Sequence, residues 1–123
     1  MKTARILVVD DDALILQALS RILQSEGYDV VAHSDPVKAS QEEKFSVVIT
    51  DFMMPQLNGI ELLNRLKSSN PDSVRLLLTA ASDFKVASDA VNRGEVYRLL
   101  AKPWSLHELT ACVRQAVQHF HLL

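Results

Sequence analysis

The sequence is poor in cysteine, glycine, proline and aromatic residues. Its 123 residues include one cysteine, three glycines and four prolines, and 6% are aromatic. The single cysteine, Cys112, cannot form an intramolecular disulfide, so a reducing, cytoplasmic setting is expected. No stretch rich in glycine or proline marks a linker, and no internal repeat or low-complexity tract is present. At 123 residues the chain is long enough to bury a continuous core without disulfides, so one domain over residues 1–123 is expected.

Long hydrophobic runs and a strong charge of either sign are also lacking. No apolar run approaches the roughly 20 residues needed to span a bilayer. The N-terminal sequence reaches acids too early for a signal peptide. Thirteen Lys and Arg against fifteen Asp and Glu give a net charge of −2, which provides no electrostatic reason to bind nucleic acid or an anionic membrane. We expect neither as a direct partner.

Three acids, Asp10, Asp11 and Asp12, follow the apolar run ILVV directly. One carboxylate would suffice to cap the helix that follows. Three neighbouring acids repel one another unless a cation lies among them or solvent surrounds each of them. The run therefore indicates either a cation site or a capped and solvated turn.

Five short segments have the composition of strands. Residues 6–9, 47–49 and 74–80 are apolar and rich in branched side chains, as in strands buried on both faces of a parallel sheet. Residues 28–33 and 96–101 are more mixed, which is typical of strands nearer an edge.

Segments with helical periodicity separate these strands. Five helices alternating with five strands predict an α/β fold with a doubly wound parallel sheet and right-handed crossovers. The first helix is predicted by an apolar stripe of Ile15, Ala18, Leu19, Ile22 and Leu23 that ends at Gly27, and the second by a cap at Ser34–Pro36 before the poorly amphipathic VKASQEEK. Capping boxes at Asn58–Glu61 and Ser105–Glu108 begin the third and fifth helices, and Ser82 or Asp83 begins a fourth that ends at Asn92–Gly94. The fifth helix has an apolar stripe of Leu106, Leu109, Val113, Ala116, Val117 and Phe120.

Polar residues stand at the carboxyl ends of the predicted strands, where open α/β sheets bind ligands. Asp10 and Asp11 follow the first strand, Asp51 the third, Thr79 the fourth and Lys102 the fifth. Together they provide a nucleophile, carboxylates for a divalent cation, a hydroxyl and an ammonium, which is what phosphoryl transfer to a carboxylate requires. Magnesium fits this set better than a closed zinc site.

Four segments, VVDDDA, ITDFMMPQLNG, LLLTAAS and LLAKPW, resemble in order and position the signature segments of the response regulator receiver domain of two-component signalling. The resemblance covers essentially the whole chain. It implies a flavodoxin-like (βα)5 fold with strand order 2-1-3-4-5.

The resemblance also implies roles for particular residues. Asp51 matches the phosphorylated aspartate, and Asp10 and Asp11 match the acidic pair that binds Mg²⁺. The backbone carbonyl of Met53 would complete the metal site. Asp12 lies outside the pair and is expected to cap the first helix.

Thr79 matches the switch hydroxyl, and Lys102 matches the lysine that bridges the phosphoryl group and the acidic pair, with a cis bond to Pro103 expected. One position departs from the family. Leu99 occupies the place of the usual switch aromatic, with Tyr97 two residues earlier; strand alternation predicts that both point to the same side. Tyr97 could then replace the aromatic in part, or the switch is muted.

By resemblance, the side chains of Met53 and Ala81 flank the path of the hydrolytic water, and neither can orient a water strongly. Slow to moderate autodephosphorylation is therefore expected. The expected partners are a sensor histidine kinase or phosphotransfer protein and an effector. The face built from the fourth helix, fifth strand and fifth helix is expected to contact the effector or a second copy.

Two other function classes remain open. Asp10–Asp12 also satisfy the DxD pattern of haloacid-dehalogenase-like phosphatases, although that assignment leaves Asp51 unexplained. A receiver-like interaction module that is not phosphorylated is the other, and Leu99 is the residue that favours it. His33, His107, His119 and His121 have no ligand spacing beyond the terminal pair and are interpreted as surface residues.

Overall fold

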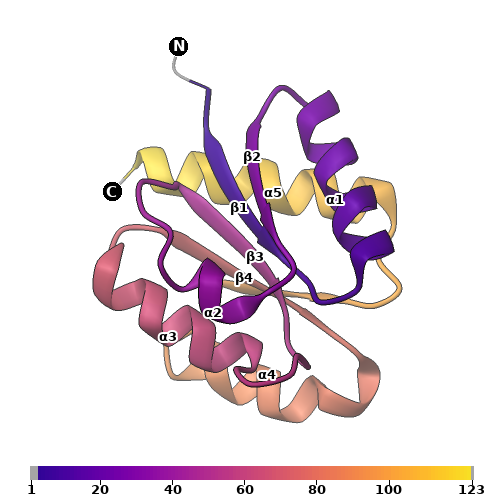
Figure 1. The fold of residues 1–123 in the computed structure, drawn as a ribbon, viewed down its shortest axis with the longest axis vertical. Coiled ribbons are helices and arrows are strands. Elements are labelled where there is room, and N and C mark those ends of the chain that lie inside the picture. The colour runs from indigo at the N-terminus through magenta and orange to yellow at the C-terminus, as the bar shows by residue number, and fades with distance from the viewer. Residues whose placement is uncertain (1–2, 123) are drawn as a thin grey trace.

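The computed structural model describes residues 3–122, which form a parallel sheet between two layers of helices (Figure 1). The strands lie in the order β2-β1-β3-β4-β5, which confirms the predicted fold class and strand order. In chain order the elements are β1 (Arg5–Val9), α1 (Ala13–Ser25), β2 (Asp29–His33), α2 (Pro36–Ala39), β3 (Val47–Asp51), α3 (Gly59–Ser69), β4 (Val74–Thr79), the 3₁₀ turn η1 (Ala81–Asp83), α4 (Phe84–Asn92), β5 (Arg98–Ala101) and α5 (Leu106–His121).

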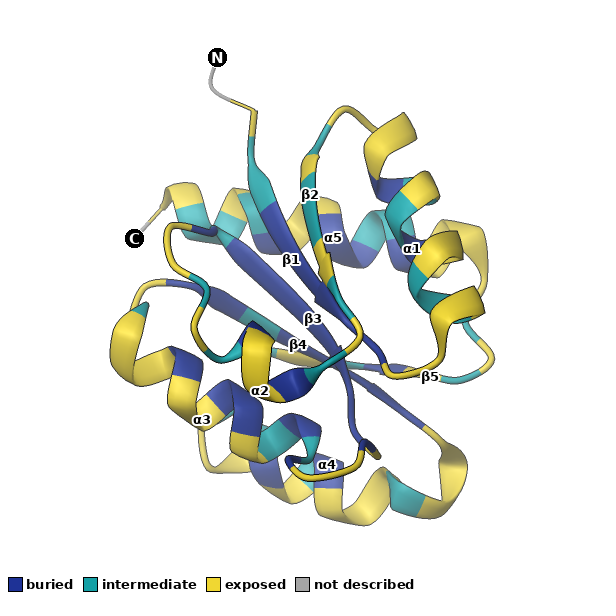
Figure 2. Ribbon diagram, in the orientation of Figure 1, coloured by how far each residue is buried: buried dark blue, intermediate teal, exposed yellow. Residues whose placement is uncertain are grey.

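The central strands are the most deeply buried part of the molecule (Figure 2). All five residues of β3 are buried, whereas the edge strands β2 and β5 each contain two exposed residues. The two segments predicted as edge strands are therefore confirmed as edges. A sheet covered on both faces explains why the central strands are continuous apolar runs.

Two hydrophobic clusters cover the two faces of the sheet. One contains side chains of α2, α3 and α4, and the other contains side chains of α1 and α5. Two predicted stripe positions are wrong. Ala18 is exposed and Leu16 packs against the core in its place, and Leu106 is 60% exposed because it begins α5 beyond the edge of the core.

Helix ends follow the predicted caps with local differences. Asp35 caps α2, but this helix ends at Ala39 because VKASQEEK offers no apolar stripe to bury. Asn58 and Glu61 form both halves of a capping box, whereas Ser105 accepts from the backbone N–H of Glu108 without the reciprocal bond. The fourth helix begins after η1, and Asp83 makes no side-chain capping bond.

The fifth strand is shorter than predicted, and this corrects the placement of Tyr97. β5 begins at Arg98, so Tyr97 precedes the strand and does not follow its alternation. Leu99 packs on the α3 and α4 side, whereas Tyr97 packs on the α5 side and its ring stacks on His119 at 4.6 Å between centroids. The two side chains therefore lie on opposite faces of the sheet.

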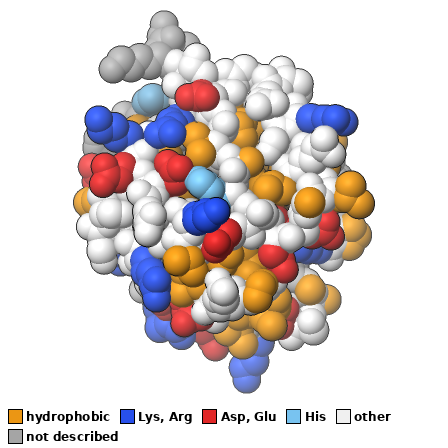
Figure 3. Space-filling view, in the orientation of Figure 1, with side chains coloured by type: hydrophobic (Ala, Val, Ile, Leu, Met, Phe, Trp, Pro, Cys, Tyr) orange, Lys and Arg blue, Asp and Glu red, His pale blue; other side chains and the backbone are white. Residues whose placement is uncertain are grey.

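The surface carries charges of both signs. On the face drawn in Figure 3, basic and acidic side chains are interspersed, and hydrophobic side chains gather toward the lower half. Within residues 3–122, no helix combines the length and the hydrophobicity needed to cross a membrane.

Candidate functional site

Three carboxylates meet at the carboxyl ends of β1 and β3. Asp10 and Asp11 directly follow β1, and Asp51 is the last residue of the neighbouring strand β3. One carboxylate oxygen from each of these three residues lies within 4.8 Å of the others. Oxygen atoms at this spacing can bind one small divalent cation such as Mg²⁺.

Lys102 joins the two buried acids of this group. Its Nζ lies 2.6 Å from Oδ1 of Asp51 and 3.8 Å from Oδ2 of Asp10. The backbone N–H of Lys102 donates to the carbonyl of Thr79 at 2.9 Å, and the bond to Pro103 is cis, as predicted. The loop after β5 is thereby tied to the end of β4, with the ammonium directed at the acids.

Asp10 has one carboxylate oxygen without a hydrogen-bond partner. The residue is 1% exposed, and its Oδ1 accepts from the backbone N–H of Asp12 at 2.9 Å. Its Oδ2 is buried and makes no hydrogen bond to any of residues 3–122. Burial raises the pKa of Asp10, and the neighbouring charges of Asp51 and Asp11 act in the same direction. A buried oxygen that accepts no hydrogen bond and lies beside two further carboxylates fits a cation ligand.

Asp12 has a different task from its two neighbours. Its carboxylate accepts from the backbone N–H groups of Leu14 and Ile15 at the start of α1. The residue is therefore the N-cap, as the sequence predicted. The three consecutive acids divide into two candidate ligands and one cap.

The predicted site residues do not all face one another. The Thr79 side chain is buried and its hydroxyl donates to the carbonyl of Ala80 at 3.1 Å, and no bond joins it to the acids in the described part of the chain. The Met53 side chain is 63% exposed. Thr79 thus lies at the end of the strand beside β3, with its hydroxyl bonded along its own backbone.

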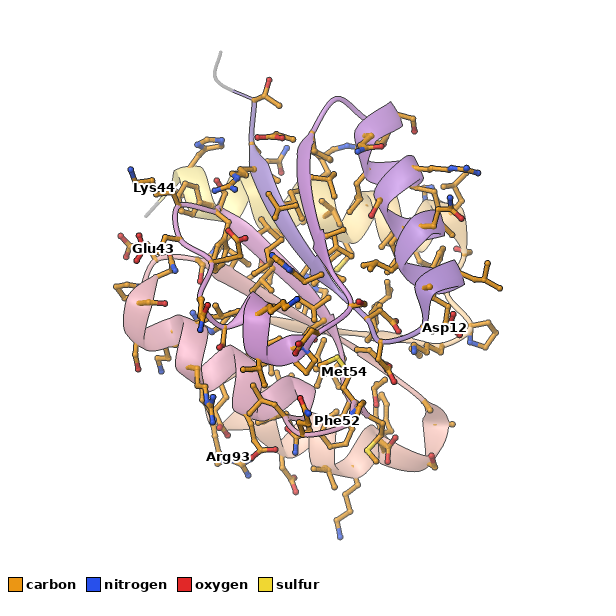
Figure 4. All side chains as sticks on the ribbon, viewed as in Figure 1. Asp12, Glu43, Lys44, Phe52, Met54 and Arg93 are labelled. Atoms are coloured by element: carbon orange, nitrogen blue, oxygen red, sulfur yellow. The ribbon has the colours of Figure 1, made fainter. Side chains whose placement is uncertain are left out.

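The turn after β3 is closely fitted to the start of α3. Phe52 and Met54 are buried while Met53 is exposed, and Figure 4 places the first two beside the end of β3. The backbone N–H of Gly59 donates to the carbonyl of Phe52 at 2.7 Å. A Cβ on Gly59 would lie 2.3 Å from the carbonyl oxygen of Asp51, so no larger residue fits here without movement.

An apolar groove of about 440 Å³ lies next to Lys102 and is lined by Ile15, Lys102, Pro103 and Trp104. Leu14, the residue before Ile15 in α1, is 77% exposed. This groove was not predicted from the sequence. The sequence feature that could have predicted it is the apolar pair Leu14 and Ile15, in the first turn of the helix that begins next to the acids.

The histidines take no part in this site. His33 Nε2 bonds the Glu42 carboxylate at 2.7 Å, and His119 stacks on Tyr97. His107 and His121 are exposed, as predicted, whereas His33 and His119 are partly buried. Of the acidic, histidine and cysteine side chains that the structure describes, only the three aspartates form a group close enough to hold a metal.

Comparison with known proteins gives a consistent result. The response regulator receiver domain family matches residues 6–114. The chain is 32% identical to the DNA-binding transcriptional regulator NtrC of Proteus hauseri over 98% of this chain and 26% of that protein. It is 34% identical to the transcriptional regulatory protein FixJ of Bradyrhizobium diazoefficiens over 92% of this chain and 56% of that protein.

A solved structure matches over nearly the full length of this chain. It is the signal receiver domain of an HD domain-containing protein from Pseudomonas fluorescens Pf-5, with 36% identity, a TM-score of 0.90, and coverage of 99% of this chain and 100% of that one. The chain spans about a quarter of the length of the first curated relatives. The family match, the sheet order and the acidic cluster agree, and the chain belongs to the response regulator receiver domain family.

Proposed function

We propose that this domain accepts a phosphoryl group from a phosphohistidine of a partner kinase onto Asp51. The observation that carries the proposal is the placement of Lys102 between Asp51 and Asp10, within a group of three carboxylates. A carboxylate oxygen of Asp51 would attack phosphorus. The bond from phosphorus to the histidine nitrogen would break, and the imidazole would leave with the electron pair.

The surrounding residues have separate roles in this proposal. Asp10, Asp11, Asp51 and the backbone carbonyl of Met53 would hold Mg²⁺, which neutralises phosphoryl oxygen charge when bound. The ammonium of Lys102 already contacts one oxygen of Asp51 and would pair with the arriving phosphoryl group.

Thr79 would change its hydrogen-bond partner when phosphate arrives. Its hydroxyl would turn from the carbonyl of Ala80 to a phosphoryl oxygen. The hydroxyl carries one proton and can donate to one acceptor at a time, so this rotation exchanges one bond for another.

Water would later release the phosphoryl group. The Met53 side chain is exposed and Ala81 is also at the surface, and neither carries a group that could orient a water molecule. We infer an aspartyl phosphate that decays slowly to moderately without a partner.

Two surfaces suit the expected partners of a cytoplasmic signalling domain. The apolar groove of Ile15, Pro103 and Trp104 borders Lys102, so a partner seated there would bring a phosphohistidine close to Asp51. The face of α4, β5 and α5 is the proposed contact for an effector or for a second copy of this chain. Relatives such as NtrC, of which the chain covers a quarter, support an effector within a longer protein.

One observation favours a second function, a receiver-like module that binds partners without being phosphorylated. Leu99 replaces the switch aromatic, and Tyr97 stacks on His119 on the other face of the sheet. Tyr97 therefore does not substitute for the aromatic in this conformation. Leu99 of β5 and Val91 of α4 pack against the same hydrophobic cluster, so their contacts are the proposed route from β5 to α4.

The deciding experiment is intact-mass analysis after incubation with acetyl phosphate, with and without Mg²⁺, on the wild type and on Asp51→Asn. We expect a base-labile gain of one phosphoryl group that needs Mg²⁺ and is absent in Asp51→Asn. No adduct despite Mg²⁺ binding would favour the unphosphorylated module. An adduct that survives Asp51→Asn and is lost in Asp10→Asn would place the nucleophile on β1, as in the phosphatase alternative.

A further inference from the structure

The last two residues of β3 differ in what their side chains contact. Asp51 points to the acidic cluster, whereas Thr50 is fully buried, with Val9 and Leu77 as its register partners on the neighbouring strands. A hydroxyl buried among apolar strands raises the cost of burial unless it is hydrogen-bonded. Valine has the same shape and would fill this position without that cost. The hydroxyl of Thr50 therefore needs an explanation beyond packing.

The Thr50 hydroxyl contacts the turn that follows Asp51. Its Oγ1 donates to the backbone carbonyl of Asp51 at 3.0 Å and lies 3.9 Å from Sδ of Met54. The same carbonyl of Asp51 is the atom that a Cβ on Gly59 would meet. The Asp51 carbonyl thus accepts a hydrogen bond from a hydroxyl of its own strand. It also lies against the backbone of Gly59, the first residue of α3.

We propose that Thr50 is a positioning residue for the phosphoacceptor site. Its hydroxyl holds the Asp51 peptide so that the Asp51 carboxylate and the Met53 carbonyl face the same cation. The hydrogen bond restrains the first peptide of the turn after β3. The Met54 side chain restrains the same turn because it is buried in the core. The inference rests on the proposed function, since it assigns Thr50 a role in metal binding and phosphoryl acceptance.

The test is to measure Mg²⁺ affinity by calorimetric titration and Tm in EDTA for three full-chain variants. Thr50→Val removes the hydroxyl and keeps the shape, and we expect the Kd for Mg²⁺ to rise about tenfold. The Tm in EDTA should fall only slightly, because apolar volume is retained and one hydrogen bond is lost. Thr50→Ser should restore the Kd and lower the Tm, since it keeps the hydroxyl and loses a buried methyl group. Thr110→Val is the matched control, because it removes a hydroxyl that donates to the Leu106 carbonyl within α5, and its Kd should stay close to the wild-type value.

The outcomes separate this inference from the proposed function. A wild-type Kd in Thr50→Val, with Mg²⁺ binding to the wild type and not to Asp10→Asn, overturns the positioning role alone. A wild type that neither binds Mg²⁺ nor forms the Asp51 adduct overturns the proposed function itself. If circular dichroism shows that Thr50→Val is unfolded, Thr50→Ala replaces it, and a wild-type Kd in that variant overturns the inference equally.

Discussion

Asp10 is buried, and an ionised carboxylate at this position lowers the stability of the metal-free protein. We expect Asp10→Asn to raise the Tm in EDTA by about 5 °C, because it removes a buried charge and keeps an oxygen that can accept from the N–H of Asp12. Thermal unfolding followed by circular dichroism measures this. An unchanged or lower Tm would show that Lys102 already compensates the charge.

The same residue predicts a pH dependence. The folded-state pKa of Asp10 lies above its ordinary value of 3.8. The stability that protonated Asp10 contributes is therefore fully present below the unfolded-state pKa. It is lost as the pH rises through the raised pKa of the folded state. We expect the Tm difference between Asp10→Asn and the wild type, measured in EDTA, to be largest near neutral pH and to shrink as the pH falls toward 4. A difference that grows on acidification contradicts the assignment.

Met53 and Ala81 predict the lifetime of the phosphorylated state. Met53→Asn and Ala81→Glu each introduce a polar group that can orient a water molecule, so acyl-phosphate decay should accelerate by about tenfold or more. Decay is followed by intact mass after removal of acetyl phosphate. Glu43→Gln, an exposed change remote from the site, is the control. Equal lifetimes in all variants would exclude these positions as determinants.

At the scale of elements, the contact between β3 and α3 depends on one glycine. Gly59→Ala should destabilise the protein by about 2 kcal/mol, because its Cβ would overlap the carbonyl of Asp51 and the side chain of Leu77. Alanine is otherwise the better helix former, so propensity alone predicts the opposite sign. Urea unfolding gives the free energy, and Mg²⁺ affinity should fall as well.

Gly27→Ala is the matched control for that substitution. Gly27 has a positive φ of 92°, and beyond the glycine and its chain neighbours no atom lies within 4 Å of the position that an alanine methyl group would occupy. It therefore tests backbone strain without steric overlap. We expect a loss of about 1 kcal/mol and an unchanged Mg²⁺ affinity. Equal Mg²⁺ affinities in the two variants would mean that the Gly59 contact does not shape the site.

The sequence predicted helices and strands correctly where a local pattern, an apolar run or a helix cap, was enough to define the element. The apolar runs of β1, β3 and β4 require burial on both faces, and the caps at Asp12, Asp35 and Asn58 require only local geometry. The ends of α2 and β5 were missed because they depend on packing. α2 stops where its apolar stripe ends, and β5 starts where its pairing with β4 begins.

The site was predictable to the extent that sheet topology brings strand ends together. Asp10, Asp51 and Lys102 meet because β1, β3, β4 and β5 all end at one edge. The direction of the Thr79 hydroxyl and the face occupied by Tyr97 depend on side-chain packing between distant segments, such as the stack on His119. No spacing along the chain encodes those contacts.

For the whole molecule, binding of a cation to the folded state alone should stabilise it. We expect Mg²⁺ at about 100 times its Kd to add about 2.7 kcal/mol to the free energy of unfolding of the wild type, and EDTA to reverse the gain. Asp10→Asn should show little of this gain. Asp72→Asn changes an exposed acid in the turn before β4 and should keep all of it. A gain in both variants would indicate nonspecific binding.

The chain has a single tryptophan, and the fold places it beside this site. Trp104 lines the groove with Lys102 and Pro103, whereas both tyrosines, Tyr28 and Tyr97, immediately precede strands and so lie toward the opposite end of the sheet. Indole emission therefore arises from one place, adjacent to the acids. Its intensity should report metal binding, phosphorylation and partner docking in real time, so the domain contains its own optical probe and needs no attached dye.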